Sequence, residues 1–238
     1  MTGSGEFVSW LRSAASEGER PVEPAATVVL LRDGSGGLET LLVRKNSKIA
    51  FGGMWVFPGG RIDDGDRHGT DPHDDVAAAQ RAAAREAGEE AGLAVDPATL
   101  VPWSFWVPPV HTPRRFATWF FLAPAPPGEV TVDGGEVHAH RWIRPADMIE
   151  LRDQGEAELA PPTWVTLHTL AGFASCGHAM TAAARQTPER FETRVAAVEE
   201  GIAALWQGDA GYEAADGEVE GPRHRLVMSE TRWLYERS

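Results

Sequence analysis

The chain has 238 residues, of which 42% are apolar and 24% are charged. This composition is ordinary for a globular protein and excludes an intrinsically disordered or collagen-like chain. The net charge of −13 arises from 22 Lys plus Arg against 35 Asp plus Glu. Such a surface repels phosphate backbones, so we expect no nucleic-acid partner.

Cysteine usage and hydropathy bear on the compartment. Cys176 is the single cysteine, which rules out an internal disulfide framework and a zinc site built from several cysteines. No stretch approaches the ~18–20 consecutive apolar residues of a membrane-spanning helix. The first residues carry neither the basic nor the apolar region of a secretory signal. We therefore expect no membrane partner and a cytoplasmic location.

The sequence divides into three predicted parts. Residues 1–24 form a lead-in, residues 25–158 form an α/β core, and residues 159–238 form a helical C-terminal extension that packs on the core. In the core, an apolar run at 25–32 ends in a glycine-rich turn and is followed by a second run at 39–44, which predicts a hairpin. Shorter runs predict further strands at 55–57, 101–110, 116–122 and 137–143.

Helices are predicted in both the core and the extension. The alanine-rich segment 74–91 contains no proline and is followed by Gly92, which is typical of a helix and its C-terminal stop. A second core helix is predicted at 145–152. In the extension, apolar residues at near-helical spacing predict helices at 163–175, 180–186 and 188–206, then a loop at 207–222 and a last strand at 225–228.

Three glutamates on the alanine-rich helix give the first functional indication. Glu86, Glu89 and Glu90 stand at positions i, i+3 and i+4, so they share one helical face. Like charges at this spacing cost a helix a few tenths of a kcal/mol per pair. A divalent cation such as Mg²⁺, which prefers oxygen ligands, would offset that repulsion. The alternative is an acidic face that is simply solvated.

The residues around this helix resemble the signature of Nudix hydrolases, G-x5-E-x7-R-E-U-x-E-E-x-G-U, where U is apolar. Gly60 matches the first glycine, and the run from Arg85 to Leu93 matches the whole second half. Two departures stand out. Asp66 replaces the first glutamate, and 18 residues rather than seven separate it from Arg85.

The resemblance implies a fold and a set of roles. The fold is an α/β/α sandwich, in which a mixed sheet lies between helices. Glu86, Glu89 and Glu90 would hold Mg²⁺ or Mn²⁺, with the carbonyl of Gly60 as an additional ligand. Either Glu89 or Glu136 would act as general base. Arg85 would orient a carboxylate through charge-assisted hydrogen bonds.

Two arginines are candidates for binding the phosphates of the substrate. Arg44 ends a predicted strand that points toward the Gly60 loop, and Arg115 precedes an aromatic strand. An ordinary surface position is the alternative for each.

Insertions within the signature also occur in a branch of the family that includes peroxisomal coenzyme A diphosphatases. The segments 112–121 and 161–163, and Glu136 followed by Trp142, resemble that branch. The resemblance implies metal-dependent hydrolysis of a nucleoside diphosphate linked to another moiety, with coenzyme A or acyl-coenzyme A as one candidate. ADP-ribose, a nucleotide sugar or a dinucleotide is the alternative substrate, and a non-catalytic nucleotide sensor is the alternative function. Dimers are common in the family, so a homodimer stays an alternative to a monomer.

Overall fold

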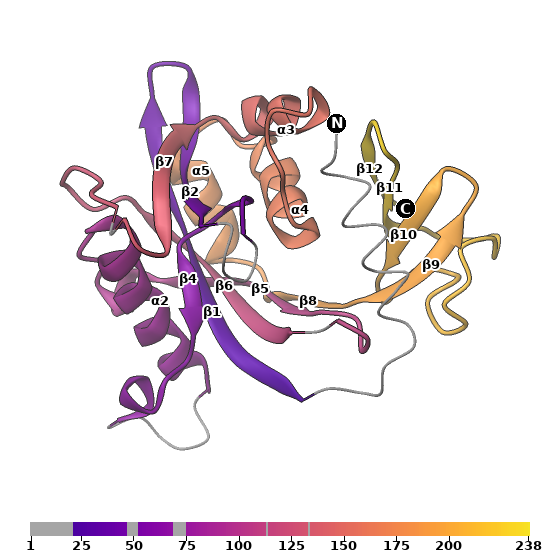
Figure 1. Ribbon diagram of the computed structural model, residues 1–238, viewed down its shortest axis with the longest axis horizontal. Helices are drawn as coiled ribbons and strands as arrows, with labels where there is room; N and C mark the ends of the chain where they lie inside the picture. Colours follow the sequence, from indigo (N-terminus) through magenta and orange to yellow (C-terminus); the bar gives the residue numbers. More distant parts are fainter. Residues whose placement is uncertain (1–20, 47–51, 69–74, 113, 133) are drawn as a thin grey trace.

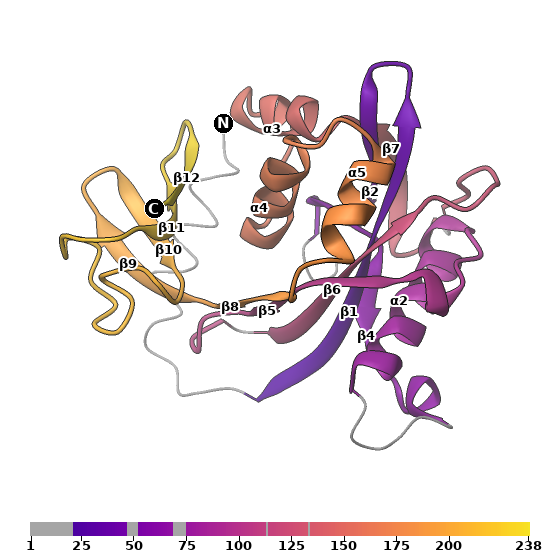
Figure 2. The same cartoon turned by 180° about the vertical axis from the view of Figure 1, so that it is seen from behind.

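The protein contains two sheets that lie next to each other. The computed structural model describes residues 21–46, 52–68, 75–112, 114–132 and 134–238. Figures 1 and 2 show a large twisted sheet with helices on both faces and a smaller sheet formed by the last part of the chain. Residues 1–20 of the predicted lead-in and residues 69–74 of the insertion lie outside the described residues.

The strands of the larger sheet come from the first 192 residues. Their bounds are β1 (Val22–Gly34), β2 (Gly37–Lys45), β3 (Trp55–Val56), β4 (Gly59–Arg61), β5 (Val101–Val107), β6 (Arg115–Pro124), β7 (Val137–Ile143) and β8 (Glu189–Glu192). The smaller sheet comprises β9 (Arg194–Val198), β10 (Gly201–Leu205), β11 (His224–Met228) and β12 (Trp233–Arg237). The α-helices are α2 (Asp75–Ala91), α3 (Pro145–Asp153), α4 (Pro161–Leu170) and α5 (Cys176–Ala183), and 3₁₀ turns occur at η1 (Asp64–Arg67) and η2 (Pro97–Thr99).

The larger sheet is mixed. Within the described residues its strand order is β3-β2-β1-β6-β5-β8, with β4 paired to β1 and β7 paired to β2. β1 runs parallel to β6, and β5 runs parallel to β8, whereas β1 and β2 form an antiparallel hairpin. This mixed sheet between helices confirms the predicted α/β/α sandwich.

Alternation along β1 explains how the sheet is covered on both faces. Val28 and Leu30 pack with the alanines of α2, whereas Val29 and Leu31 belong to the core on the opposite face, where α3, α4 and α5 lie. Successive side chains of a strand point to opposite faces, so a continuous apolar run is what a sheet covered on both sides requires. The predicted strand at 25–32 is therefore found, although β1 already begins at Val22.

Helix α2 is built for close contact with the sheet. Its buried face consists of small residues, namely Ala78, Ala79, Ala82, Ala83, Ala87 and Ala91, together with Glu90. Gly92 follows with a positive φ of 67°, a conformation that glycine adopts without steric cost. The helix predicted at 74–91 is thus confirmed from residue 75 onward. None of the helices in the described ranges has the length and apolar composition needed to cross a membrane.

Of the three helices predicted in the extension, the one at 188–206 is wrong. The chain is helical in α4 and α5, but the segment predicted as a helix at 188–206 forms β8, β9 and β10 instead. Residues 194–198 pair with residues 201–205 across a two-residue turn at Glu199 and Glu200. Alanine-rich sequence favours a helix locally, but tertiary pairing overrides this weak preference. The last strand, predicted at 225–228, is confirmed as β11.

An aromatic cluster joins the two sheets. Trp106 of β5 stacks on Phe191 of β8, with ring centroids 3.9 Å apart and an interplanar angle of 3°. Trp206, which follows β10, meets both rings edge-on, at 5.7 Å from Trp106 and 5.2 Å from Phe191. Because β8 pairs with β5, this cluster fixes the smaller sheet against the edge of the larger one.

Candidate active site

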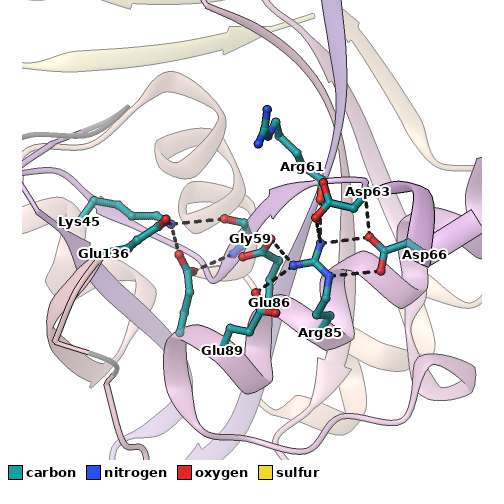
Figure 3. A network of polar contacts seen from close by, with 10 residues as sticks. Lys45, Gly59, Arg61, Asp63, Asp66, Arg85, Glu86, Glu89 and Glu136 are labelled. Atoms are coloured by element: carbon teal, nitrogen blue, oxygen red, sulfur yellow. Dashed lines mark hydrogen bonds and ion pairs between the residues drawn. The ribbon is translucent and has the colours of Figure 1, made fainter.

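Arg85 forms hydrogen bonds with several acidic residues of the site. Its guanidinium donates to Glu86 Oε1 at 2.8 Å and to Glu89 Oε2 at 2.9 Å, both on its own helix. It also donates to the Arg61 carbonyl at 2.9 Å, which ties α2 to β4. Figure 3 shows Arg85 between these glutamates and Asp66. Hydrogen bonds that Arg85 donates to Asp66 and then to Glu86 raise the pKa of Arg85 despite the opposing effect of burial, so the guanidinium is a fixed positive charge.

Asp66 lies where the signature has its first glutamate, and it contacts Arg85 directly. The guanidinium reaches Asp66 through two bonds, Nε to Oδ1 at 3.2 Å and Nη2 to Oδ2 at 3.0 Å. Asp66 is buried and also accepts from the Asp63 amide at 2.9 Å. The inserted residues and the shorter side chain therefore leave this contact intact, because η1 brings Asp66 back beside the helix.

Glu90 is the most buried of the three glutamates, with 3% of its surface exposed. Lys45 donates from Nζ to Glu90 Oε1, and the Gly59 amide donates to Glu90 Oε2 at 3.0 Å. Lys45 also reaches the Gly59 carbonyl at 3.4 Å and lies 3.9 Å from Glu136 Oε2. Sequence reasoning missed Lys45. The available signal was a lysine at the end of a continuous apolar strand, where a buried charge needs a partner.

Gly60 is in close contact with Glu86. A Cβ atom at Gly60 would collide with the Glu86 carboxylate, so any other residue would displace that side chain from its position. Burial raises the pKa of Glu86, and the hydrogen bond from Arg85 opposes this rise without cancelling it. An additional cation nearby would stabilise the charged form of such a buried carboxylate.

Of the other predicted site residues, Glu89 and Glu136 line the cavity, whereas Arg44 and Arg115 do not. Glu89 and Glu136 are largely exposed, with 60% and 66% of their side chains accessible, and both line the same cavity as Glu86 and Glu90. Arg44 is exposed and donates to the Gly53 carbonyl at 3.0 Å, away from the residues that line the cavity. Arg115 is buried and donates to the Pro108 carbonyl at 3.5 Å, and its neighbour Arg114 lines the cavity instead.

The donor set suits a hard divalent cation. In the described part of the chain, no three acidic, histidine or cysteine side chains already form a metal cluster, and Arg85 and Lys45 engage the carboxylates. The Lys45 ammonium nevertheless shows that a cation is held here by oxygen atoms of Glu90, Gly59 and Glu136. Carboxylate and carbonyl oxygens are the ligands that Mg²⁺ and Mn²⁺ take. The residues present therefore fit such a metal.

Comparisons with known proteins identify the family that this chain resembles. A family model described as NUDIX domain matches residues 21–163. A NUDIX hydrolase from Alicyclobacillus acidocaldarius is similar in structure, with 26% sequence identity, a TM-score of 0.61 and coverage of 68% of this chain and 96% of that chain. A MutT NUDIX hydrolase from Burkholderia pseudomallei shows 24% identity and a TM-score of 0.46, over 63% of this chain and 98% of that one. The search of curated proteins finds no significant match.

The family match covers more than half of the chain and includes β1, the Gly59–Gly60 turn, the whole of α2 and Glu136. Nudix hydrolases act on nucleoside diphosphates linked to other moieties, and they generally use Mg²⁺ or Mn²⁺. The chain therefore belongs to the NUDIX family and is a hydrolase that acts on phosphoric anhydride bonds.

Proposed function

We propose that this protein is a metal-dependent diphosphatase whose substrate is a nucleoside diphosphate linked to a second moiety, with coenzyme A and its thioesters as the first candidates. The observation that carries the proposal is that Arg85 and the three glutamates of α2 line one cavity together with Gly60 and Glu136. The insertion between Asp66 and Arg85 supports the coenzyme A branch, as do Pro161 and Pro162, which line the same cavity.

The chain's own residues would divide the work as follows. Glu86, Glu89 and Glu90 would hold the metal, with the Gly60 carbonyl as an additional ligand. When bound, Mg²⁺ or Mn²⁺ neutralises phosphate oxygens and lowers the pKa of a coordinated water. Arg85 keeps Glu86 and Glu89 in place, and Asp66 in turn keeps Arg85 in place. Positioning and charge stabilisation of this kind supply most of the acceleration in phosphoryl transfer.

The general base is one of two exposed carboxylates. Glu89 and Glu136 both reach the cavity, and their exposure lets either accept a proton from an attacking water. Glu90 is unsuited to that role because Lys45 and the Gly59 amide already engage both of its oxygens.

Arg114 is the better candidate for a phosphate contact than Arg115. It is exposed and lines the cavity, whereas the guanidinium of Arg115 is buried beside Pro108. An exposed arginine can meet a phosphate through two parallel hydrogen bonds.

The test is a substrate panel with the Glu86→Gln variant. Purified protein is incubated with Mg²⁺ or Mn²⁺ and coenzyme A, an acyl-coenzyme A, ADP-ribose, a nucleotide sugar or a dinucleotide, and the monophosphate products are separated by chromatography. We expect Glu86→Gln to lower kcat/KM at least a hundredfold, about 2.7 kcal/mol in barrier. Glu86 is preferable to Glu90, since changing Glu90 would also strip Lys45 of a buried partner.

Glu156→Gln, which changes an exposed glutamate after α3, serves as the control and should retain full activity. Hydrolysis of nothing on the panel would contradict an enzymatic role and favour a nucleotide sensor. Full activity of Glu86→Gln, or activity that persists in a chelator, would contradict the metal role of this carboxylate.

A further inference from the structure

The cavity that contains the carboxylates extends far beyond them. Its volume is about 870 Å³, and its walls come from β1, α2, β5, β6, the start of α4 and the smaller sheet. The strands β9 to β12 lie beyond residues 21–163, the part that matches the family model. The far wall of the cavity, away from α2, is therefore built in part by strands that lie outside the family match.

The far wall is apolar. It consists of aromatic residues from the larger sheet and aliphatic residues from the smaller one, namely Trp106, Phe116, Phe120, Val195, Ala204 and Met228. Ala204 and Met228 are only 2% and 1% exposed yet border the cavity, so the cavity reaches into the seam between the sheets. Among the described residues, β9, β10 and β11 contribute no charged side chain to this lining.

Three threonines, Thr112, Thr118 and Thr193, line the cavity close to these apolar residues in the chain, and the Thr118 hydroxyl donates to the Phe116 carbonyl at 3.2 Å. Thr193 accepts a hydrogen bond from Trp206 Nε1 at 3.0 Å, so its hydroxyl oxygen is already engaged. Thr112 lines the cavity, and its buried hydroxyl has no hydrogen-bond partner in the described structure. A nucleobase or a sugar would need several partners here, whereas a hydrocarbon needs none. One unpartnered hydroxyl suits a single amide or ester group next to such a hydrocarbon.

Because carboxylates line one end of the cavity and apolar residues line the other, we infer that the moiety linked to the diphosphate carries a hydrocarbon chain. Val195, Ala204 and Met228 of the smaller sheet would select this chain. The inference rests on the proposed diphosphatase function and adds the chemistry of the second substituent. The acidic end would take the metal and the diphosphate, and the apolar end would remove the hydrocarbon from water. Burial of one methylene favours binding by about fourfold.

The first experiment is a homologous series. ADP esterified on its β-phosphate with linear alcohols of increasing length, from ethyl to decyl, is hydrolysed in the presence of Mg²⁺ next to ADP-ribose. We expect kcat/KM to rise two- to fourfold for each added methylene and then to level off where the cavity ends. If this series and the thioester series described next are both flat, while ADP-ribose or another compound is still cleaved, the inference is overturned and the diphosphatase function is left intact. If no compound is cleaved, the proposed function and the inference both fail.

A parallel series of fatty acyl coenzyme A thioesters separates two sources of the hydrocarbon. A rise with chain length in either series supports the inference, and the series with the higher kcat/KM identifies how the chain is attached. No rise in both series would contradict it.

The second experiment compares two variants on one strand. Val195 is half-buried in the lining, whereas Ala197, two residues further along β9, is exposed and lies outside it. Val195→Phe should reduce the gain in kcat/KM of the decyl over the ethyl ester at least tenfold. Ala197→Phe should behave like the wild type.

Val195→Asp provides a second test that does not depend on accommodating a larger ring. It should also penalise long chains selectively, because the hydrocarbon would then face a carboxylate. Melting temperatures confirm that each variant is folded. If Val195→Phe and Val195→Asp are both folded and both keep the full chain-length dependence, the smaller sheet does not select the substrate.

Discussion

Lys45 and Arg85 show how two cations organise one acidic site. Arg85 engages Asp66, Glu86 and Glu89, and Lys45 engages Glu90. Their environments differ, because Lys45 is buried on a strand whereas Arg85 lies at the edge of the cavity. The repulsion expected among three glutamates on one helical face is thus offset within the chain itself. A bound metal would add to this arrangement rather than create it.

Lys45→Met should make the folded state depend on a divalent cation. Removing the ammonium leaves Glu90 buried with only the Gly59 amide as donor, and loss of one partner of a buried ion pair costs about 3–5 kcal/mol. In a chelator the melting temperature should fall. In Mg²⁺ or Mn²⁺ it should recover in part, because the metal supplies a countercharge, so the metal-induced rise exceeds that of the wild type.

Arg44→Met is the matched control, since this neighbouring residue is exposed and donates only to the Gly53 carbonyl among the contacts described. Its melting temperature should stay close to that of the wild type under both conditions. An equal metal-induced rise in Lys45→Met and the wild type would show that Glu90 does not bind the cation.

The sequence alone predicts those features of the site that depend on the spacing of residues along the chain. The spacing of Glu86, Glu89 and Glu90 places them on one helical face whatever the fold. The partners of these residues were not predictable, because Lys45 lies 45 residues from Glu90 and is brought there by sheet pairing. The same holds for Arg115, whose burial depends on how the loop before β6 folds over it.

At the scale of elements, the short strand β4 connects the larger sheet with helix α2, because it pairs with β1 and its Arg61 carbonyl accepts from Arg85. Gly59 pairs with Thr27 of β1, and Gly60 pairs with Ala26. A Cβ atom at Gly59 would collide with the backbone of β1, whereas one at Gly60 would collide with the Glu86 carboxylate. Two adjacent glycines therefore serve different purposes, one for packing and one for the site.

Alanine substitutions should separate these two purposes. Gly59→Ala presses on backbone atoms that cannot move away, and overpacking of this kind typically costs about 1–3 kcal/mol of stability. Gly60→Ala presses on a flexible side chain, so it should preserve the melting temperature but displace Glu86 and lower kcat/KM at least tenfold. Thermal unfolding and steady-state kinetics measure the two effects.

Gly65→Ala is the control, because a Cβ atom at that position meets nothing within 4 Å. It should change neither stability nor activity. If Gly60→Ala kept full activity, close contact between Gly60 and Glu86 would not matter for the reaction.

The elements themselves were predicted well where sequence and environment agree. The core strands are continuous apolar runs and the core helix α2 is rich in alanine, and glycine or proline residues mark where these elements end. In the segment 194–205, the alanine content and the near-helical spacing of Val195, Val198, Ile202 and Leu205 suggested a helix. The pairing of β9 with β10 and of β10 with β11 decided the outcome, and such long-range pairing is not encoded in a local window.

At the scale of the whole molecule, the smaller sheet depends on one buried ion pair. Asp209 follows β10, and both of its oxygens accept from the Arg225 guanidinium of β11 at 2.7 Å. It also accepts from the amides of His224 and Gly211 at 2.9 Å each. Burial alone would raise the pKa of Asp209, but the bonds from Arg225 and the two amides hold this pKa at about 2.

The depressed pKa of Asp209 makes the stability of the protein depend on pH in a defined direction. An unfolded aspartate titrates near pH 3.9, so the contribution of Asp209 is complete above that pH and is lost as the pH falls toward 2. Asp209→Asn should lower the free energy of unfolding by about 3 kcal/mol or more at pH 7, because Arg225 loses its buried partner. The difference from the wild type should shrink between pH 4 and pH 3.

Urea unfolding at several pH values measures this difference. Glu199→Gln, an exposed position in the turn between β9 and β10, should unfold like the wild type throughout. A difference between Asp209→Asn and the wild type that is constant from pH 7 to pH 3 would show that the charge of Asp209 is not what stabilises the sheet.

Both sheets line the same cavity, so the residues for hydrolysis and the residues for substrate selection come from different parts of the chain. The α2 carboxylates and their partners come from residues 45–90 and Glu136 directly precedes β7, whereas the far apolar wall includes Val195, Ala204 and Met228, which belong to a different sheet. Substitutions that retune substrate preference can therefore accumulate in the last part of the chain without disturbing the hydrolytic residues. A mutant library confined to β9, β10 and β11 is thus the shortest route to a new substrate range at an unchanged chemical step.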